Sequence, residues 1–222
     1  MVVWTYGMNE IKSITEIFHN AYLVKFSSQY AITSTLMRLQ EFYESPTKLK
    51  NHYFNLEEFM DDYAKKHGNF SYCEDWGGFN IPDFAIRKFE SIFAGALIKK
   101  EQAFINLLAN TIDGYYAGDK FYLIAVSEDE YIDHELAHAF YYLIPKYKKA
   151  MNLETRAYGD LKALHIALLS KGYSYANFFD EVQAYLATSN KREIKSLLGY
   201  EWKQPPIEHR QIFKRYKKDV LF

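Results

Sequence analysis

The chain has 222 residues, of which 49% are hydrophobic and 18% aromatic, and its formal net charge is −1. This length and composition predict one folded domain with a substantial core, and they exclude a disordered or low-complexity chain. The near-zero net charge argues against nucleic acid as a partner, and the single cysteine, Cys73, excludes a disulfide framework or a cysteine-rich zinc site.

Residues 1–7 lack the basic start and apolar run of a signal peptide. No window of the sequence approaches the length of apolar residues that a membrane span requires, because charged residues interrupt the longest runs. We therefore expect a cytoplasmic protein without a membrane span.

The first half of the chain predicts short strands and several helices. Asn55 followed by Glu58 is a capping box, which marks the start of a helix that runs to about Lys65. Apolar spacing predicts strands at residues 2–6 and 23–26, and further helices at residues 9–21, 31–43, 82–93 and 99–112.

Residues 70–82 combine aromatic side chains with the adjacent glycines Gly77 and Gly78, a pattern typical of a tight turn. We favour an ordered loop whose aromatic side chains fill the core. The alternative is a substrate cleft lined by Trp76, Phe79 and Asn80.

Residues 121–126 form an almost continuous apolar run, which predicts a buried or edge strand. The strand leads directly into a helix, because Ser127 and Glu130 have the spacing of a capping box. Pro145 is expected to end or kink this helix near Ile144.

The predicted helix contains the sequence His-Glu-x-x-His, formed by His134, Glu135 and His138. Residues four apart lie on the same face of a helix, so both imidazoles can point at one metal ion. Glu135 can then reach a water molecule bound to that metal and act as its general base. The motif predicts a zinc hydrolase with a third protein ligand elsewhere in the chain.

The motif resembles the active-site helix of the zincin metallopeptidases. The resemblance implies an α+β, mostly helical chain, with a small N-terminal sheet packed on the active-site helix and a single metallopeptidase domain over residues 1–222. It also implies that a strand lies along the active-site cleft and pairs with extended substrate, and residues 121–126 are the candidate for that strand.

The position of the third ligand distinguishes the branches of the zincin family. The metzincin branch would require Gly and His where this chain has Tyr141 and Ile144, so the gluzincin branch, with a downstream carboxylate ligand, remains. Glu181 is the preferred ligand, because it lies in a strongly helical segment and Ala184 follows it three residues later, as in several gluzincin-like families. The alternatives are Glu154, His165, Asp160 and Asp180.

The resemblance implies that Glu135 activates a zinc-bound water, and that a hydrogen-bond donor stabilises the oxyanion. Tyr173 and Tyr175 are the candidates for this donor, ahead of Tyr185 and Tyr158. Either Asp133 or Asp180 is a candidate to hold a ligand imidazole in the right tautomer.

These features together predict a zinc-dependent metallopeptidase that acts on a peptide or protein. The alternatives are a zinc hydrolase acting on a non-peptide amide or ester, and a non-catalytic zincin-fold binding module. Residues 207–220 predict a basic amphipathic helix, which we interpret as a solvated face. The alternative is a surface that contacts nucleic acid, an acidic partner or a membrane.

Overall fold

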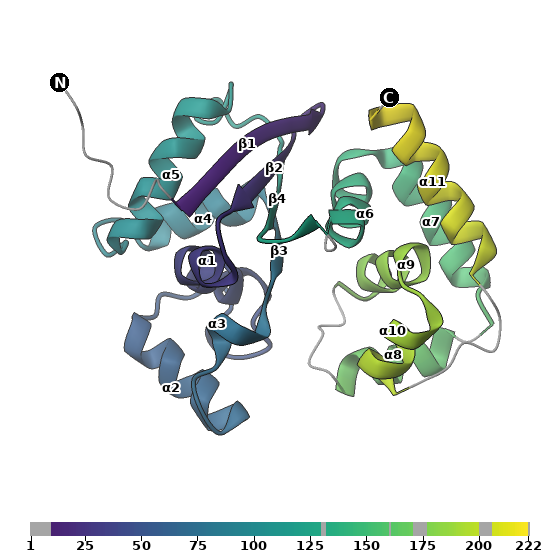
Figure 1. The fold of residues 1–222 in the computed structure, drawn as a ribbon, viewed down its shortest axis with the longest axis horizontal. Helices are drawn as coiled ribbons and strands as arrows, with labels where there is room; N and C mark the ends of the chain where they lie inside the picture. The colour runs from purple at the N-terminus through teal and green to yellow at the C-terminus, as the bar shows by residue number, and fades with distance from the viewer. Residues whose placement is uncertain (1–9, 130–131, 160, 171–176, 200–205, 222) are drawn as a thin grey trace. The chain divides into compact units, whose positions relative to one another are not determined.

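The computed structural model describes residues 10–129, 132–159, 161–170, 177–199 and 206–221. The chain is mostly helical with one small mixed sheet, which confirms the predicted α+β class (Figure 1). It divides into two compact units, Met1–Tyr131 and Ile132–Phe222. The single domain over residues 1–222 stays a prediction, as does the packing of the sheet on the active-site helix.

The described strands of the first unit form one sheet in the order β1-β2-β4-β3. Strand β4 pairs in parallel with β2 and antiparallel with β3, so both of its edges are hydrogen-bonded within the sheet. A strand in this position cannot pair with a substrate. The expectation that residues 121–126 form the substrate-binding strand is therefore wrong, although the strand itself is confirmed. The strands are β1 (Ile11–Phe18), β2 (Ala21–Phe26), β3 (Gly78–Pro82) and β4 (Tyr122–Val126).

The helix predicted at residues 9–21 is wrong, because this segment forms β1 and the turn of a hairpin. Phe18 pairs with Ala21, which leaves His19 and Asn20 as the turn residues. Asn20 has a φ of +64°, a left-handed conformation that Asn tolerates better than most residues. The β-branched residues of β1 suit the strand. The strand predicted at residues 2–6 lies outside the described residues.

Helix α1 lies against strands β2, β3 and β4, with Leu36 and Phe42 fully buried in the core (Figure 1). The capping box of Asn55 and Glu58 is present at the start of α2, as predicted. The helices of this unit are α1 (Gln29–Glu44), α2 (Leu56–His67), α3 (Tyr72–Asp75), α4 (Asp83–Ile92) and α5 (Lys99–Thr111).

Residues 70–82 contain the short helix α3 and the edge strand β3. Tyr72 and Phe79 are buried in the core, whereas Trp76 is 43% exposed. The Asn80 amide oxygen accepts a hydrogen bond from the Tyr122 hydroxyl at 2.6 Å. The prediction that aromatic side chains of this segment fill the core is confirmed for Tyr72 and Phe79.

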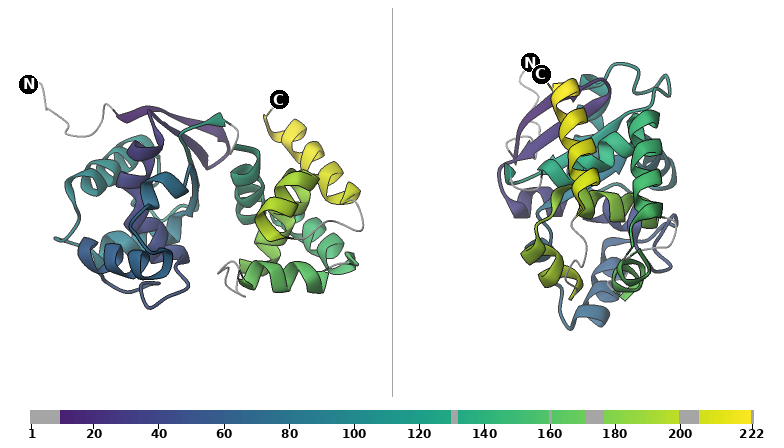
Figure 2. Two further views of the ribbon diagram at one scale, coloured as in Figure 1. Left: turned by 60° about the horizontal axis from the view of Figure 1, so that its bottom comes forward. Right: turned by 90° about the vertical axis from the view of Figure 1, so that its right-hand side faces the viewer.

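The described part of the second unit is helical. Helix α6 ends at Leu143 and α7 begins at Pro145, as the proline predicts. Helix α9 packs against α6, α7 and α11, and α11 runs along α7 (Figures 1 and 2). The helices are α6 (Ile132–Leu143), α7 (Pro145–Ala157), α8 (Leu161–Ser170), α9 (Phe178–Thr188), α10 (Lys191–Leu198) and α11 (Ile207–Leu221).

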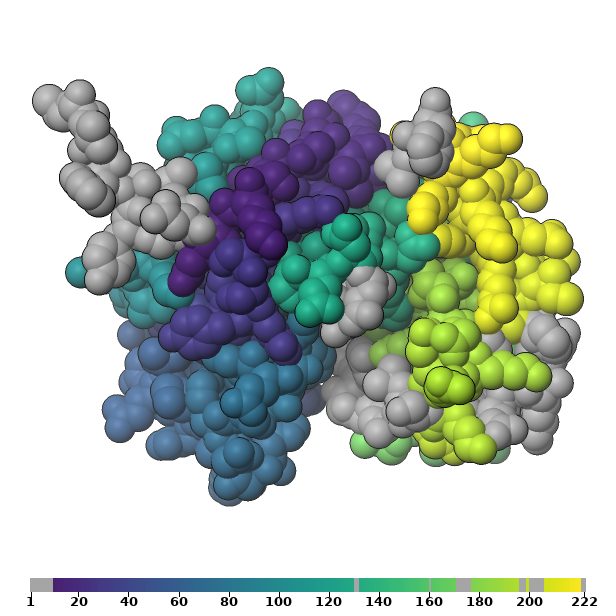
Figure 3. Space-filling model, in the orientation of Figure 1, coloured from purple at the N-terminus to yellow at the C-terminus, as the bar shows by residue number. Residues whose placement is uncertain are grey.

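Helix α11 forms an exposed surface of the second unit (Figure 3). It buries His209 and Phe213, while Lys217 pairs with Asp133 and Arg210 donates to the carbonyl of Ser189. The remaining basic side chains of this helix, Lys214, Arg215 and Lys218, are exposed. Every described helix of the protein is too short or too polar to cross a lipid bilayer.

Candidate metal centre

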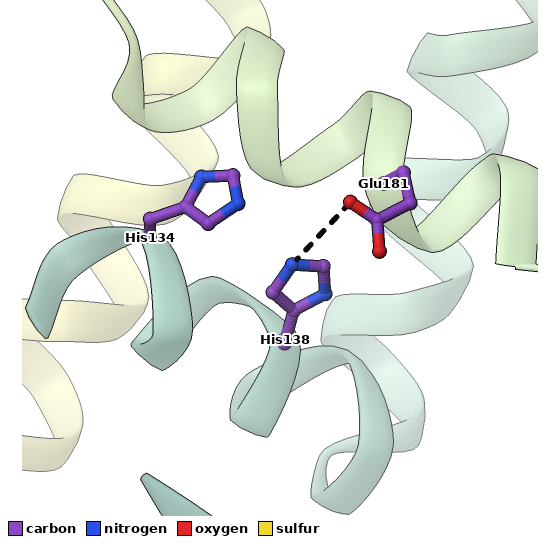
Figure 4. A group of neighbouring side chains, drawn as sticks. All are labelled: His134, His138 and Glu181. Carbon is purple, nitrogen blue, oxygen red and sulfur yellow. Dashed lines mark ion pairs between the residues drawn. The ribbon is translucent and has the colours of Figure 1, made fainter. Parts of the chain in front are cut away.

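Three side chains of the second unit converge on one point. Helix α6 supplies His134 and His138, and α9 supplies Glu181 (Figure 4). One ligand atom from each residue lies within 4.8 Å of those of the other two, and His138 Nε2 lies 3.9 Å from Glu181 Oε2. Tetrahedral zinc holds its ligand atoms roughly 3.3 Å apart, so a small contraction would bring these atoms to bonding positions.

Close packing between α6 and α9 produces this convergence. Ala137 and Ala184 are fully buried, and such small side chains allow neighbouring helices to approach closely. Leu136, Ala139 and Phe140 are also fully buried along α6, which fixes the rotation of that helix. The two histidines, four residues apart, therefore share one face of α6.

Asp180 holds the imidazole of His138. Its Oδ1 lies 2.8 Å from His138 Nδ1, so Nδ1 carries a proton, and Nε2 is the ring nitrogen that faces Glu181. Burial lowers the pKa of His138, but the carboxylates of Asp180 and Glu181 outweigh it and raise this pKa to about 10. The same negative surroundings that favour a protonated imidazole would favour a bound cation.

The Thr188 hydroxyl contacts the imidazole of His134, as Asp180 contacts that of His138. His134 Nδ1 lies 3.3 Å from Thr188 Oγ1, and that hydroxyl donates to the carbonyl of Ala184 at 2.7 Å. Because the Thr188 hydroxyl donates its proton to Ala184, it can only accept from His134. The His134 imidazole therefore donates from Nδ1 and keeps its Nε2 lone pair. Burial and the neighbouring His138 both lower the pKa of His134, which favours the neutral ring that a metal requires.

Glu135 follows His134 on α6 and is only 7% exposed. Its charge contributes to the raised pKa of His138, which places the carboxylate within electrostatic reach of the cluster. The ring of Tyr185 lies 4.8 Å from that of His134 and covers one side of it. A carboxylate in this position can accept a proton from a nucleophile at the cluster.

The structure separates the competing predictions for the remaining ligand and positioning residues. Asp133 pairs with Lys217 on α11, whereas Asp180 contacts His138.

Glu154 lies on α7 and does not belong to the His134–His138–Glu181 cluster. His165 lies on α8, with its ring 4.3 Å from that of Phe178.

Several predicted residues lie outside the described part of the chain: Tyr173, Tyr175, Asp160 and Glu130 of the expected capping box. Tyr158 packs against His209 with a ring separation of 5.9 Å. Sequence reasoning missed Thr188, because a threonine near the end of a helix carries no motif of its own. Only the packing of α9 on α6 shows its contact with His134.

The donor set fits a zinc ion, since two imidazole nitrogens and one carboxylate are ligands typical of catalytic zinc sites. Both imidazoles are held through Nδ1, as metal-ligating histidines usually are. Comparison with known proteins gave no match to any protein-family model, curated protein or solved structure.

Proposed function

We propose that this protein is a zinc-dependent metallopeptidase of the gluzincin type with a zincin-like fold, and that it hydrolyses peptide bonds in cytoplasmic peptides or proteins. The convergence of His134, His138 and Glu181 carries the proposal. The His-Glu-x-x-His motif alone specifies two ligands and a base, and the nearness of the Glu181 carboxylate on α9 supports it as the third ligand.

In this proposal His134, His138 and Glu181 would hold the metal, the two imidazoles through Nε2 and the glutamate through a carboxylate oxygen. When bound, zinc would supply Lewis-acid chemistry toward water and toward the substrate carbonyl. Glu135 accepts a proton from the attacking water on its carboxylate, and then delivers that proton to the nitrogen of the leaving amine. Asp180 and Thr188 keep the two imidazoles in the tautomer that this arrangement needs.

The buried Glu135 favours an enzyme over a non-catalytic binding module, because a purely structural zinc site has no need of a base beside its ligands. The order of the strands bears on the choice between a peptide and a small amide or ester as the substrate. Because β4 is paired on both edges, the strand expected to hold an extended peptide does not have an open edge. The second candidate is a zinc hydrolase that acts on a small non-peptide amide or ester, a substrate that needs no strand edge to hold it.

The proposal is tested by measuring zinc in the purified protein by elemental analysis and assaying it with quenched fluorescent peptides and a panel of aryl amides and esters. We expect about one zinc per chain in the wild type and in Glu135→Gln. Hydrolysis in that variant should fall by about 10²- to 10⁴-fold, the usual contribution of a general base.

Peptide cleavage that stops with a chelator and returns with zinc would support the peptidase. Cleavage of aryl substrates alone would move the assignment to the second candidate. A wild-type protein that takes up no zinc would exclude both.

A further inference from the structure

Gln183 lies at the centre of a buried polar network that joins three helices. Its side chain on α9 is fully buried, and its Nε2 donates to Asp180 Oδ1 and to the carbonyl of Ala137 on α6, each at 3.2 Å. Its Oε1 accepts a hydrogen bond of 2.9 Å from the Tyr147 hydroxyl on α7. A buried amide is costly to leave unpaired, so these bonds fix its position.

The two acceptors beside Gln183 determine which way its amide faces. The reverse orientation would place the amide oxygen against two acceptors, the carbonyl of Ala137 and the carboxylate of Asp180. In the observed orientation the Tyr147 hydroxyl, which can donate or accept, donates to the amide oxygen. Tyr147 is fully buried, and burial raises its pKa well above the usual value. The phenol therefore keeps the proton that it donates to Gln183.

The amide in turn fixes Asp180. The Oδ1 atom of Asp180 receives two hydrogen bonds, one from Gln183 Nε2 and one from His138 Nδ1. The Asp180 side chain is 28% exposed, so without the bond from Gln183 it could rotate toward water. The chain of contacts thus runs from α7 through α9 to a candidate metal ligand on α6.

We propose that Gln183 and Tyr147 are positioning residues of the metal site, which act through Asp180 to hold the His138 imidazole with Nε2 directed at the metal. This inference rests on the proposed zinc site. Removal of an outer hydrogen-bond partner of a metal ligand typically weakens metal affinity by about 10- to 100-fold. We expect Gln183→Met to weaken zinc affinity about tenfold. Tyr147 is separated from Asp180 by one more hydrogen bond, so Tyr147→Phe should weaken zinc affinity less, by about threefold.

The experiment measures the zinc dissociation constant by competition with a chromophoric chelator, and the visible spectrum of the cobalt-substituted protein as a report on ligand geometry. Tyr147→Phe keeps the ring that packs against Phe140 and Tyr216, so it tests the hydroxyl without removing core volume. Tyr141→Phe is the matched control. The Tyr141 hydroxyl also joins α6 to α7, because it donates to the Asn152 side chain at 2.6 Å, but it makes no hydrogen bond to Asp180. We expect the control to retain wild-type zinc affinity and the wild-type cobalt spectrum.

A double-mutant cycle tests the route through Asp180. In an Asp180→Asn background, Gln183→Met should weaken zinc binding by less than about twofold, because residues that act through one another give non-additive effects. Wild-type zinc affinity in both Gln183→Met and Tyr147→Phe would overturn this inference and leave the zinc site standing. Full additivity in the cycle would also overturn it. A wild-type protein that binds neither zinc nor cobalt would overturn the zinc site and the inference together.

Discussion

Glu181 Oε2 lies 3.9 Å from His138 Nε2, although the two residues belong to different helices. A carboxylate is thus buried close to where the proposed site needs a third ligand, which a His-Glu-x-x-His motif alone does not supply. Glu181 is only 5% exposed, and a buried carboxylate is normally paired or bound to a metal. The site therefore combines a local sequence motif with a tertiary contact.

The first prediction compares Glu181 with Glu154, the other acidic residue considered for the third position. Glu181→Ala should weaken zinc affinity by at least about 100-fold, because it removes one of three protein ligands. Glu154→Ala should leave affinity at the wild-type value, since Glu154 lies outside the cluster. Competition titration with a chelator measures both, and the reverse ranking would transfer the ligand role to Glu154.

The second prediction compares two aspartates, Asp180 and Asp133. Asp180→Asn keeps the shape of the side chain but removes the charge that His138 Nδ1 contacts, so zinc affinity should fall by about 10- to 100-fold. Asp133→Asn is the matched control, because Asp133 precedes His134 directly but pairs with Lys217 instead. The same titration measures both variants, and equal losses would show that general negative charge, rather than the bond to His138, matters.

Sequence patterns predicted those residues of the candidate site whose placement depends on local structure. The spacing of His134 and His138 fixed their common helix face, and the helical context of Glu181 pointed to α9. Thr188 and Gln183 could not be predicted, because their roles depend on how α9 is rotated against α6. That rotation is set by the packing of small and apolar side chains along both helices.

In the fold too, elements set by local contacts could be predicted from the sequence, whereas elements set by pairing between distant segments could not. The capping box at Asn55 predicted the start of α2 correctly, because its hydrogen bonds form within a single turn. The sequence predicts a helix over residues 9–21, although residues 11–18 form β1. The spacing of their apolar residues does not separate the two structures, and the strand is stabilised by pairing with β2. Strand β3 was missed for a related reason, since it is short and is defined by its pairing with β4.

The third prediction concerns the turn of the β1–β2 hairpin. Asn20→Ala should lower the free energy of unfolding by about 1 kcal/mol, because alanine tolerates the left-handed φ of +64° less well than asparagine. Asn20→Gly should keep stability within about 0.5 kcal/mol of the wild type, since glycine adopts this conformation without steric strain. Urea denaturation measures both variants. If alanine and glycine are equally well tolerated, the backbone at this position is not left-handed in solution.

The fourth prediction concerns His209 on α11. His209 is 2% exposed, and its Nε2 lies 3.1 Å from the hydroxyl of the fully buried Thr155. Burial lowers the pKa of His209 to about 4 from its usual 6.5. The unfolded chain therefore takes up a proton below about pH 6.5 that the folded chain refuses, and the free energy of unfolding should fall as the pH drops from 6.5 toward 4.

The size of this effect is up to about 3 kcal/mol, because each unit of pKa difference corresponds to about 1.4 kcal/mol. His209→Gln removes the titrating group, so its free energy of unfolding should fall less than that of the wild type between pH 7.5 and pH 4.5. Urea denaturation of both proteins at these two values measures the difference, with a chelator present throughout to keep metal binding out of the comparison. An equal acid-side loss in the two proteins would show that folding does not lower the pKa of His209.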